Sequence, residues 1–158
     1  NLTFLYRAPK INLKGLSIGN IADNYAHNFK LSREDALDMA KLTRGYPFAF
    51  QALGYLTWLK DGNYKDTIMD YRQILEDRSY EKLWSELSAK DKKIAYGIAH
   101  SEDGKTKDII EFLELKPNEL NQYRKRLIKK GLVNGDTHGI LKFALPLFED
   151  FILDNYEL

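Results

Sequence analysis

Basic and amide side chains gather between Lys116 and Gly131, in the stretch KPNELNQYRKRLIKKG. This stretch holds six basic residues and one acidic residue, whereas the whole chain of 158 residues has a formal net charge of +1. Leucine and tyrosine recur at helical spacing, so a helix with one apolar face is predicted. The polar positions expected to contact a partner are Asn118, Asn121, Gln122, Arg124, Lys125 and Lys129.

These side chains fit the chemistry of DNA recognition. Asparagine and glutamine can pair with adenine edges in the major groove, while lysine and arginine contact phosphates or guanine. A second interpretation stays open, because cations near a helix C-terminus favour the helix dipole and a charged face is often simply solvated. Protein docking is a third, since a fold does not fix a function. The sequence therefore predicts DNA contact beside two alternatives.

Other motifs give no catalytic or metal site. Gly104-Lys105-Thr106 resembles the end of a phosphate-binding loop, but that loop needs a glycine where Ala99 stands and a preceding strand. We interpret it as a loop and a helix start. The three histidines stand far apart without carboxylates at metal-ligand spacing; they are His27, His100 and His138. No Ser/His/Asp set is present, so this chain is not expected to be an enzyme by itself.

The composition favours a cytoplasmic protein with a packed core. Hydrophobic residues make up 44% of the chain and aromatic residues 13%. No cysteine is present, which excludes disulfides and thiol chemistry and suits a reducing compartment. No apolar run reaches about 18 residues, so no membrane contact is predicted. Because the chain starts with NLTFLYRAPKINL, apolar and without Met, we expect a C-terminal fragment.

Three short helices are expected in residues 17–64. Apolar residues share one face of the first: Ile18, Ile21, Ala22, Tyr25 and Phe29. Ser32 with Asp35 predicts the start of the second, which should end near Arg44 and bury Ala36, Leu37 and Ala40. Gly45 is expected to stop that helix and Pro47 to open the third. The third should bury Phe48, Ala49, Ala52, Leu53, Leu56 and Leu59.

A second unit is expected after one long or two collinear helices in residues 65–87. Ser88 with Asp91 predicts a helix start, and helices should follow at 106–113, from Pro117 to Gly131, and from Pro146. The helix from Pro117 should bury Leu120, Tyr123, Leu127 and Ile128. Two short apolar runs around Asn134-Gly135 indicate a β-hairpin. The fold class is therefore mainly α: a three-helix, lid-like unit, then a winged helix-turn-helix with one small hairpin in residues 88–158.

Four stretches in order carry a resemblance to a known family: RAPKINLKGLS, ALDMAKLTRGYPFAFQALGYL, YRKRLIKKGLV and LKFALPLF. Together they resemble the C-terminal half of prokaryotic P-loop ATPases of the AAA+/STAND type, such as the archaeal ATPases. The resemblance implies that residues 1–16 are the tail of a missing ATPase core. It further implies that residues 17 to about 62 are the helical lid, and that a winged helix follows.

The resemblance also implies nucleotide contacts. Gly45-Tyr46-Pro47 matches the family's Gly-x-Pro motif, whose proline packs near the base or ribose of an adenine nucleotide. Arg7 resembles the arginine that reaches a neighbouring subunit's phosphate. Residues 48–51, Phe-Ala-Phe-Gln, lack the arginine that many AAA+ lids carry there, so a STAND-like switch matches better. Walker A and Walker B motifs are missing, so ATP and magnesium are expected only in the full-length parent.

These observations give one leading hypothesis and two rivals. The leading one is a non-catalytic, regulatory lid and winged helix of an ATP-binding switch, partnered by the missing N-terminal ATPase core, with the winged helix contacting DNA. One rival is a stand-alone winged-helix transcriptional regulator. The other is a winged helix used only for protein docking or autoinhibition.

Overall fold

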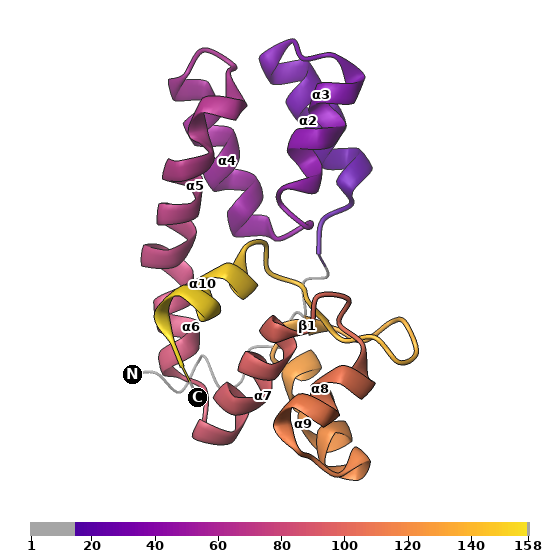
Figure 1. Cartoon of the computed structure of the whole chain (residues 1–158). Helices are drawn as coiled ribbons and strands as arrows, with labels where there is room; N and C mark the ends of the chain where they lie inside the picture. Colours follow the sequence, from indigo (N-terminus) through magenta and orange to yellow (C-terminus); the bar gives the residue numbers. More distant parts are fainter. Residues whose placement is uncertain (1–14, 158) are drawn as a thin grey trace, which may run out of the picture.

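A computed structural model of the chain describes residues 15–157, which are mainly helical with one small antiparallel hairpin (Figure 1). This confirms the coarse prediction of fold class. The elements in order are α2 (Ile18–Phe29), α3 (Arg33–Lys41), α4 (Pro47–Leu59), η1 (Tyr64–Thr67), α5 (Ile68–Leu75), η2 (Glu76–Tyr80), α6 (Glu81–Ser85), α7 (Ala89–His100), α8 (Thr106–Leu113), α9 (Pro117–Lys129), β1 (Val133–Asn134), β2 (Lys142–Phe143) and α10 (Phe148–Asn155).

Helices α2 to α5 pack together and are called the helical unit here (Figure 1). The predicted start of α3 is confirmed, because the Ser32 hydroxyl accepts a hydrogen bond from the amide of Asp35 at 3.1 Å. The predicted end near Arg44 is wrong. α3 ends at Lys41, and the Thr43 hydroxyl donates to the carbonyl of Ala40 at 2.7 Å while accepting from the amide of Gly45 at 3.1 Å. That side chain closes the helix one turn early.

Two residues expected in this core face solvent instead. Leu37 is 37% exposed, and the buried residues of its helix are Ala36 and Ala40, as predicted, together with Met39. Leu59 is 51% exposed at the end of α4. α4 is apolar on almost every side, so its sequence does not indicate which face turns inward. Tyr55 and Trp58 stack beside Leu59 on the outer face, with ring centroids 6.4 Å apart.

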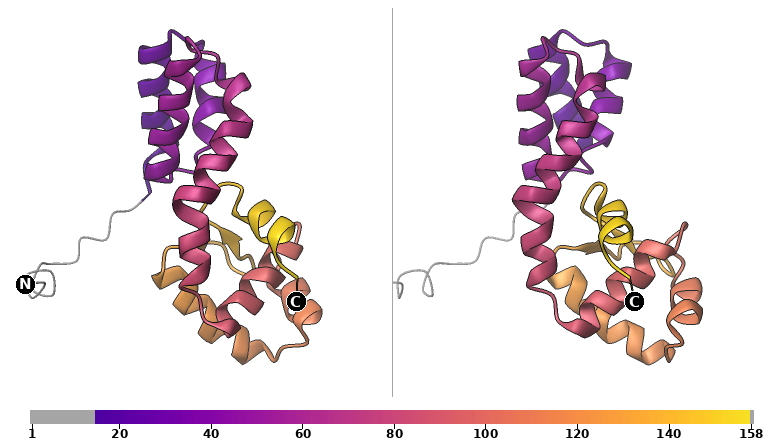
Figure 2. Two further views of the ribbon diagram at one scale, coloured as in Figure 1. Left: turned by 90° about the vertical axis from the view of Figure 1, so that its left-hand side faces the viewer. Right: turned by 60° about the vertical axis from the view of Figure 1, so that its left-hand side comes forward.

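One long rod joins the two halves of the molecule, as expected for residues 65–87. It begins with η1 and runs through α5, η2 and α6 without a break (Figure 2). η2 is a π-helical segment, a rare form that is common at functional positions in helices. The end of η2 packs against α10, where the ring of Tyr80 lies 4.9 Å from Phe148 and 5.8 Å from Phe151. We call η2 to α10 the C-terminal unit.

Within the C-terminal unit, α7, α8 and α9 precede the hairpin, and α10 covers α7 (Figures 1 and 2). In the hairpin Val133 pairs with Phe143 and Asn134 with Lys142, as the apolar runs predicted. Two details differ. Ile128 was expected inside but is 41% exposed. The last helix begins at Phe148 rather than Pro146, because Leu147 adopts a left-handed conformation with φ 58°.

Residues 1–14 lie outside the described part of the chain, and with them Arg7 and most of the predicted core tail, residues 1–16. The two tail residues that the structure describes reach the turn after α3. The amide of Leu16 donates to the carbonyl of Gly45 at 2.7 Å. This contact brings the entry to the helical unit against the Gly-x-Pro turn.

Candidate functional site

Helix α9 presents a polar, basic face to solvent. Pro117 occupies its first turn, where a missing amide hydrogen costs nothing, and the apolar face is buried through Leu120, Tyr123 and Leu127. The opposite face is exposed over its whole length and carries Asn118, Asn121, Gln122, Lys125 and Lys129. The structure therefore places five of the six predicted DNA-contacting residues together on one open surface.

The other cations of α9 make contacts inside the protein. Arg124 Nη2 donates to the carbonyl of Gly135 at 2.6 Å, which ties α9 to the loop of the hairpin. Arg126 Nε donates to Asp91 Oδ1 at 2.7 Å, and Lys130 Nζ lies 3.6 Å from Asp91 Oδ2. The basic cluster of the sequence thus separates into a structural set and a solvent-facing set, and Arg124 joins the structural one.

Asp91 is the acceptor that organises the structural set. Its side chain is 2% exposed, and its amide is held by the hydroxyl of Ser88, which caps α7 as predicted. Burial by itself raises the pKa of the Asp91 carboxyl. Hydrogen bonds from Arg126 and Ser88, with the charges of Arg126 and Lys130, outweigh that effect and hold the pKa below its usual range. Asp91 is therefore ionised and locks α9 onto the start of α7.

The hairpin is attached to the start of α8. The amide of Leu141 donates to the carbonyl of Gly104 at 2.7 Å, and the amide of Thr106 donates to the carbonyl of Gly139 at 2.9 Å. Gly104 adopts a left-handed conformation with φ 68°. Gly104-Lys105-Thr106 therefore forms the loop and helix start that we expected. The loop of the hairpin, residues 135–141, contains no lysine or arginine, but the exposed Lys142 follows it in β2 and the exposed Lys105 is bridged to Ile140.

The Gly-x-Pro turn lies at the boundary of the two units. Gly45 has φ 75°, and a Cβ atom there would lie 2.4 Å from the carbonyl oxygen of Leu16. Only glycine therefore fits at this position without a shift of the backbone. Pro47 is the first residue of α4, and the Tyr46 hydroxyl lies 2.9 Å from the hydroxyl of Ser79. Gly45, Tyr46 and Pro47 all line one cavity.

That cavity has a volume of about 600 Å³, within the range of small-ligand sites, and lies between the units. The turn forms one wall. The C-terminal end of α9 and the hairpin form the other, which includes Lys130, Leu132, Asn134 and Asp136. The family resemblance implied nucleotide contacts at the turn. The sequence did not show that the C-terminal unit forms the opposite wall of the cavity.

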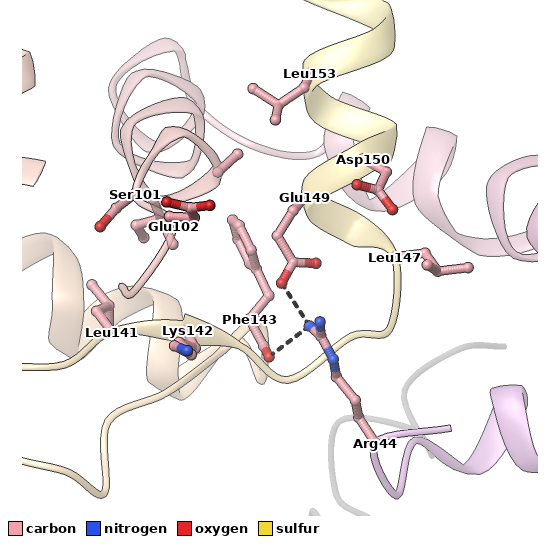
Figure 3. A pocket seen from close by; sticks show the side chains of 12 residues that line it. Arg44, Ser101, Glu102, Leu141, Lys142, Phe143, Leu147, Glu149, Asp150 and Leu153 are labelled. Atoms are coloured by element: carbon pink, nitrogen blue, oxygen red, sulfur yellow. Dashed lines mark hydrogen bonds and ion pairs between the residues drawn. The ribbon is translucent and has the colours of Figure 1, made fainter. Parts of the chain in front are cut away.

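Sequence reasoning missed Arg44 and Glu149. Arg44 Nη1 lies 2.8 Å from Glu149 Oε1, across 105 residues of chain. It also donates to the carbonyl of Phe143 at 3.2 Å (Figure 3) and to the carbonyl of Leu145 at 3.0 Å. No local pattern signals such a pair, because each residue alone reads as an ordinary charge near a helix end.

Metal binding and membrane spanning find no support in residues 15–157. Within that range no three histidine, aspartate or glutamate side chains are grouped as metal ligands. Among the same residues, no helix combines the length and the apolar character needed to cross a bilayer.

Residues 77–152 match a protein family described as a domain of unknown function (DUF8462). The match begins within η2 and ends within α10, so it covers most of the C-terminal unit and none of α2 to α5. No curated protein and no solved structure matches the chain. The family match thus supports a C-terminal unit that begins in η2, without assigning it an activity.

Proposed function

We propose that the C-terminal unit is a winged helix that binds duplex DNA through α9. The observation that supports this most directly is the open face of α9, where three amide and two lysine side chains stand together and the one acid of the helix, the exposed Glu119, lies in the first turn. The order of the elements fits: α8, a turn with Glu114 in a left-handed conformation, α9, and a hairpin. In this arrangement α9 is the helix that enters the major groove.

The division of charges on α9 gives each side chain a role in this proposal. Lys125 and Lys129 contact phosphates, which supplies affinity but little sequence preference. Asn118, Asn121 and Gln122 are nearer the N-terminal end of α9 and face the base edges, where amides pair with adenine. Arg126 and Lys130 keep α9 fixed on α7 through Asp91, so the reading helix is rigid.

Fluorescence anisotropy with a labelled mixed-sequence duplex, measured over a series of salt concentrations, tests this proposal. Affinity should fall as salt rises, and Lys125→Ala plus Lys129→Ala should reduce the slope of log K against log salt by about two. Lys60→Ala plus Lys82→Ala is the matched control, because it removes the same charge from exposed positions off α9 and should leave the slope unchanged. Undetectable or salt-independent binding contradicts DNA contact and favours protein docking.

A second function is favoured by the inter-unit cavity. We propose that the helical unit is the lid of an ATP-binding switch whose adenine nucleotide contacts Tyr46 and Pro47. A cavity of about 600 Å³ with an aromatic ring and a proline face in its walls suits a ligand with an apolar base, such as adenine. Because the second unit forms the opposite wall, a ligand there would contact both units at once. Coupling between nucleotide and DNA would follow from such shared contacts.

Saturation-transfer NMR with ATP tests the lid proposal, since it detects weak binding. The sequence predicted nucleotide only in the full-length parent, but both walls of this cavity lie within the chain itself, so weak transfer to the adenine and ribose protons is expected from the wild-type chain. It should be lost in Tyr46→Ala. The matched control is Tyr55→Ala, which removes an exposed tyrosine from the outer face of α4 and should keep the transfer. Equal transfer in wild type and Tyr46→Ala, or none in either, contradicts a nucleotide site at this turn.

A further inference from the structure

The two units are joined by more than the rod. Arg44, in the turn after α3, reaches three acceptors in the C-terminal unit: the carbonyl of Phe143 and the carboxylate of Glu149 (Figure 3), and the carbonyl of Leu145. All three contacts are made by one nitrogen, Nη1, whose two hydrogens are shared among the three acceptors. All three acceptors lie between the start of β2 and the first turn of α10. Arg44 thus holds that segment against the helical unit.

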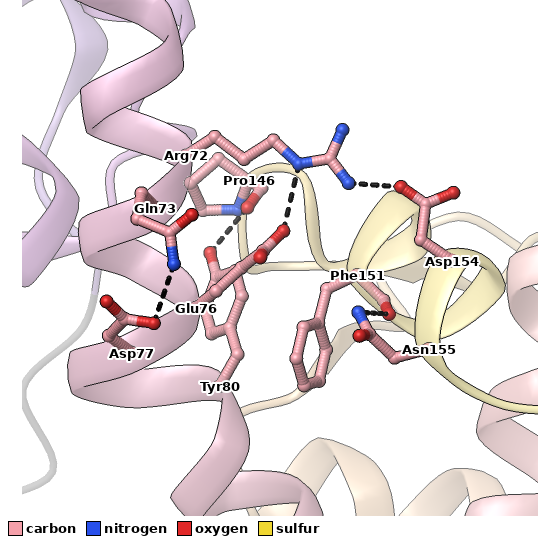
Figure 4. A network of polar contacts seen from close by, with 9 residues as sticks. All are labelled: Arg72, Gln73, Glu76, Asp77, Tyr80, Pro146, Phe151, Asp154 and Asn155. Atoms are coloured by element: carbon pink, nitrogen blue, oxygen red, sulfur yellow. Dashed lines mark hydrogen bonds and ion pairs between the residues drawn. The ribbon is translucent and has the colours of Figure 1, made fainter.

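Two weaker ties lie on the same boundary. Tyr46 makes a single hydroxyl contact with Ser79 of η2. Arg72 of α5 pairs with Asp154 of α10, but it also bonds to Glu76 of its own rod at 2.9 Å, and the Asp154 side chain is largely exposed (Figure 4). Exposed pairs contribute little, because solvent screens them. The Arg44–Glu149 pair is also partly exposed, at 39% and 28%, but Arg44 adds two carbonyl acceptors, so among residues 15–157 it makes the largest set of polar contacts between the units.

The position of η2 indicates where the units would separate. Before it, α5 packs with α4; at the last residue of η2, Tyr80 packs against α10 in the C-terminal unit and donates a hydrogen bond to the carbonyl of Pro146 (Figure 4). The match to the domain family begins at residue 77, inside η2. Packing and family boundary therefore place the junction of the two units in the same π-helical turn.

Space on both sides of Arg44 allows it to leave its partners without disturbing either core. It lines the cavity of about 600 Å³ beside the Gly-x-Pro turn and also a second cavity of about 340 Å³ formed by the end of α7, β2 and α10 (Figure 3). Among residues 15–157 no other residue lines both. The Glu149 side chain is 28% exposed, and its second carboxylate oxygen is buried without a hydrogen-bond partner in the described part of the chain. Glu149 loses its cation when Arg44 is absent. Separation of the units would rehydrate that carboxylate.

We propose that Arg44 is a clamp that fixes the angle between the helical unit and the C-terminal unit, and that its release lets the units turn about η2. Arg44 directly precedes Gly45, so the clamp residue belongs to the same turn that lines the inter-unit cavity. This device is independent of what the cavity or α9 binds.

Distance measurement between two spin labels tests the clamp, and the absence of native cysteine makes the labelling specific. Labels at Lys60→Cys, at the end of α4, and Lys107→Cys, on α8, report on the two units from exposed positions. The wild-type background should give one narrow distance distribution. Arg44→Ala should shift or broaden it, and Glu149→Gln should do so to a smaller degree, because the two carbonyl bonds remain.

Arg33→Ala is the matched control. It removes an arginine whose only ion pair, with Asp23 at 3.3 Å, lies within the helical unit, so the distribution should be unchanged. The proposal is overturned if both clamp variants overlay the wild type, or if Arg33→Ala causes an equal shift. Should Arg44→Ala unfold, the near-isosteric Glu149→Gln still decides the question. Neither DNA nor nucleotide is present, so the result does not depend on the proposed function.

Discussion

Arg126 of α9 donates through Nε to Asp91 of α7 at 2.7 Å, and this bond commits one charge of the basic helix to a contact within the protein, although the Arg126 side chain stays 46% exposed. Arg124 and Lys130 are held in a similar way. The polar side chains of the basic stretch therefore divide into two sets with different roles. Its inward cations fix the helix in the unit, and its outward lysines and amides remain for binding.

Asp91→Asn should destabilise the chain by about 1–3 kcal/mol at neutral pH, because a buried carboxylate bonded to two cations becomes neutral. The cost stays moderate since Arg126 keeps contact with solvent. The folded pKa of Asp91 is depressed, so its stabilising effect is present above the unfolded pKa of about 3.9 and is lost as pH falls through the folded value.

Urea unfolding at pH 7 and in acid measures this difference. The difference in the free energy of unfolding between wild type and Asp91→Asn should become smaller as the pH falls below about 4. Asp108→Asn, at an exposed acid in the first turn of α8, is the control and should change stability little at either pH. A difference in the free energy of unfolding that becomes larger in acid contradicts the assignment of an ionised Asp91.

Leu127→Ala and Ile128→Ala should differ sharply although the residues are neighbours on α9. Leu127 is fully buried, and its truncation should cost about 2–5 kcal/mol. Ile128 is partly exposed, so its truncation should cost below about 1 kcal/mol. Thermal or denaturant unfolding of the two variants measures the contrast. Similar losses would mean that α9 is rotated from the orientation described here, and with it the DNA-binding face.

Gly45→Ala should destabilise the chain more than Gly139→Ala. Both glycines have φ 75°, so both variants carry the backbone cost of about 1 kcal/mol. Only at Gly45 does the new methyl group meet a carbonyl oxygen, that of Leu16 at 2.4 Å, whereas nothing lies within 4 Å at Gly139. An additional loss of about 1–2 kcal/mol is expected from this overlap. Equal midpoints of unfolding for the two variants would refute the close approach.

Alkaline pH should unfold the chain before its buried tyrosines ionise. Burial raises the pKa of Tyr25, Tyr71 and Tyr80 above the ordinary value of about 10. The unfolded state releases these protons near pH 10 and the folded state does not, so stability falls as pH rises beyond that value. Phenolate absorbance followed beside circular dichroism measures both events. Full ionisation of all ten tyrosines in a chain that remains folded would contradict their burial.

Local signals in the sequence predicted most of the helices. Ser32 and Ser88 cap α3 and α7 as expected, and Pro47 and Pro117 open α4 and α9, because each device acts within four residues of the chain. Which apolar residue turns inward depends on neighbouring helices. That is why Leu59 and Ile128 were placed wrongly.

Contacts between the units were beyond sequence reasoning. The Arg44–Glu149 pair joins positions 105 residues apart, and neither residue stands out in its own segment. The cavity beside Gly45 likewise needs a wall from each unit. For α9, by contrast, the candidate face followed from helical spacing alone, and only the internal role of Arg124 required the structure.

The measurement that tests the central claim most directly is amide chemical-shift mapping of the isotope-labelled chain during titration with a DNA duplex. DNA binding through α9 predicts that the largest changes fall between residues 118 and 129 and that added salt reverses them. Changes confined to the outer face of α4, around Tyr55 and Trp58, or no change at any duplex concentration, would contradict it.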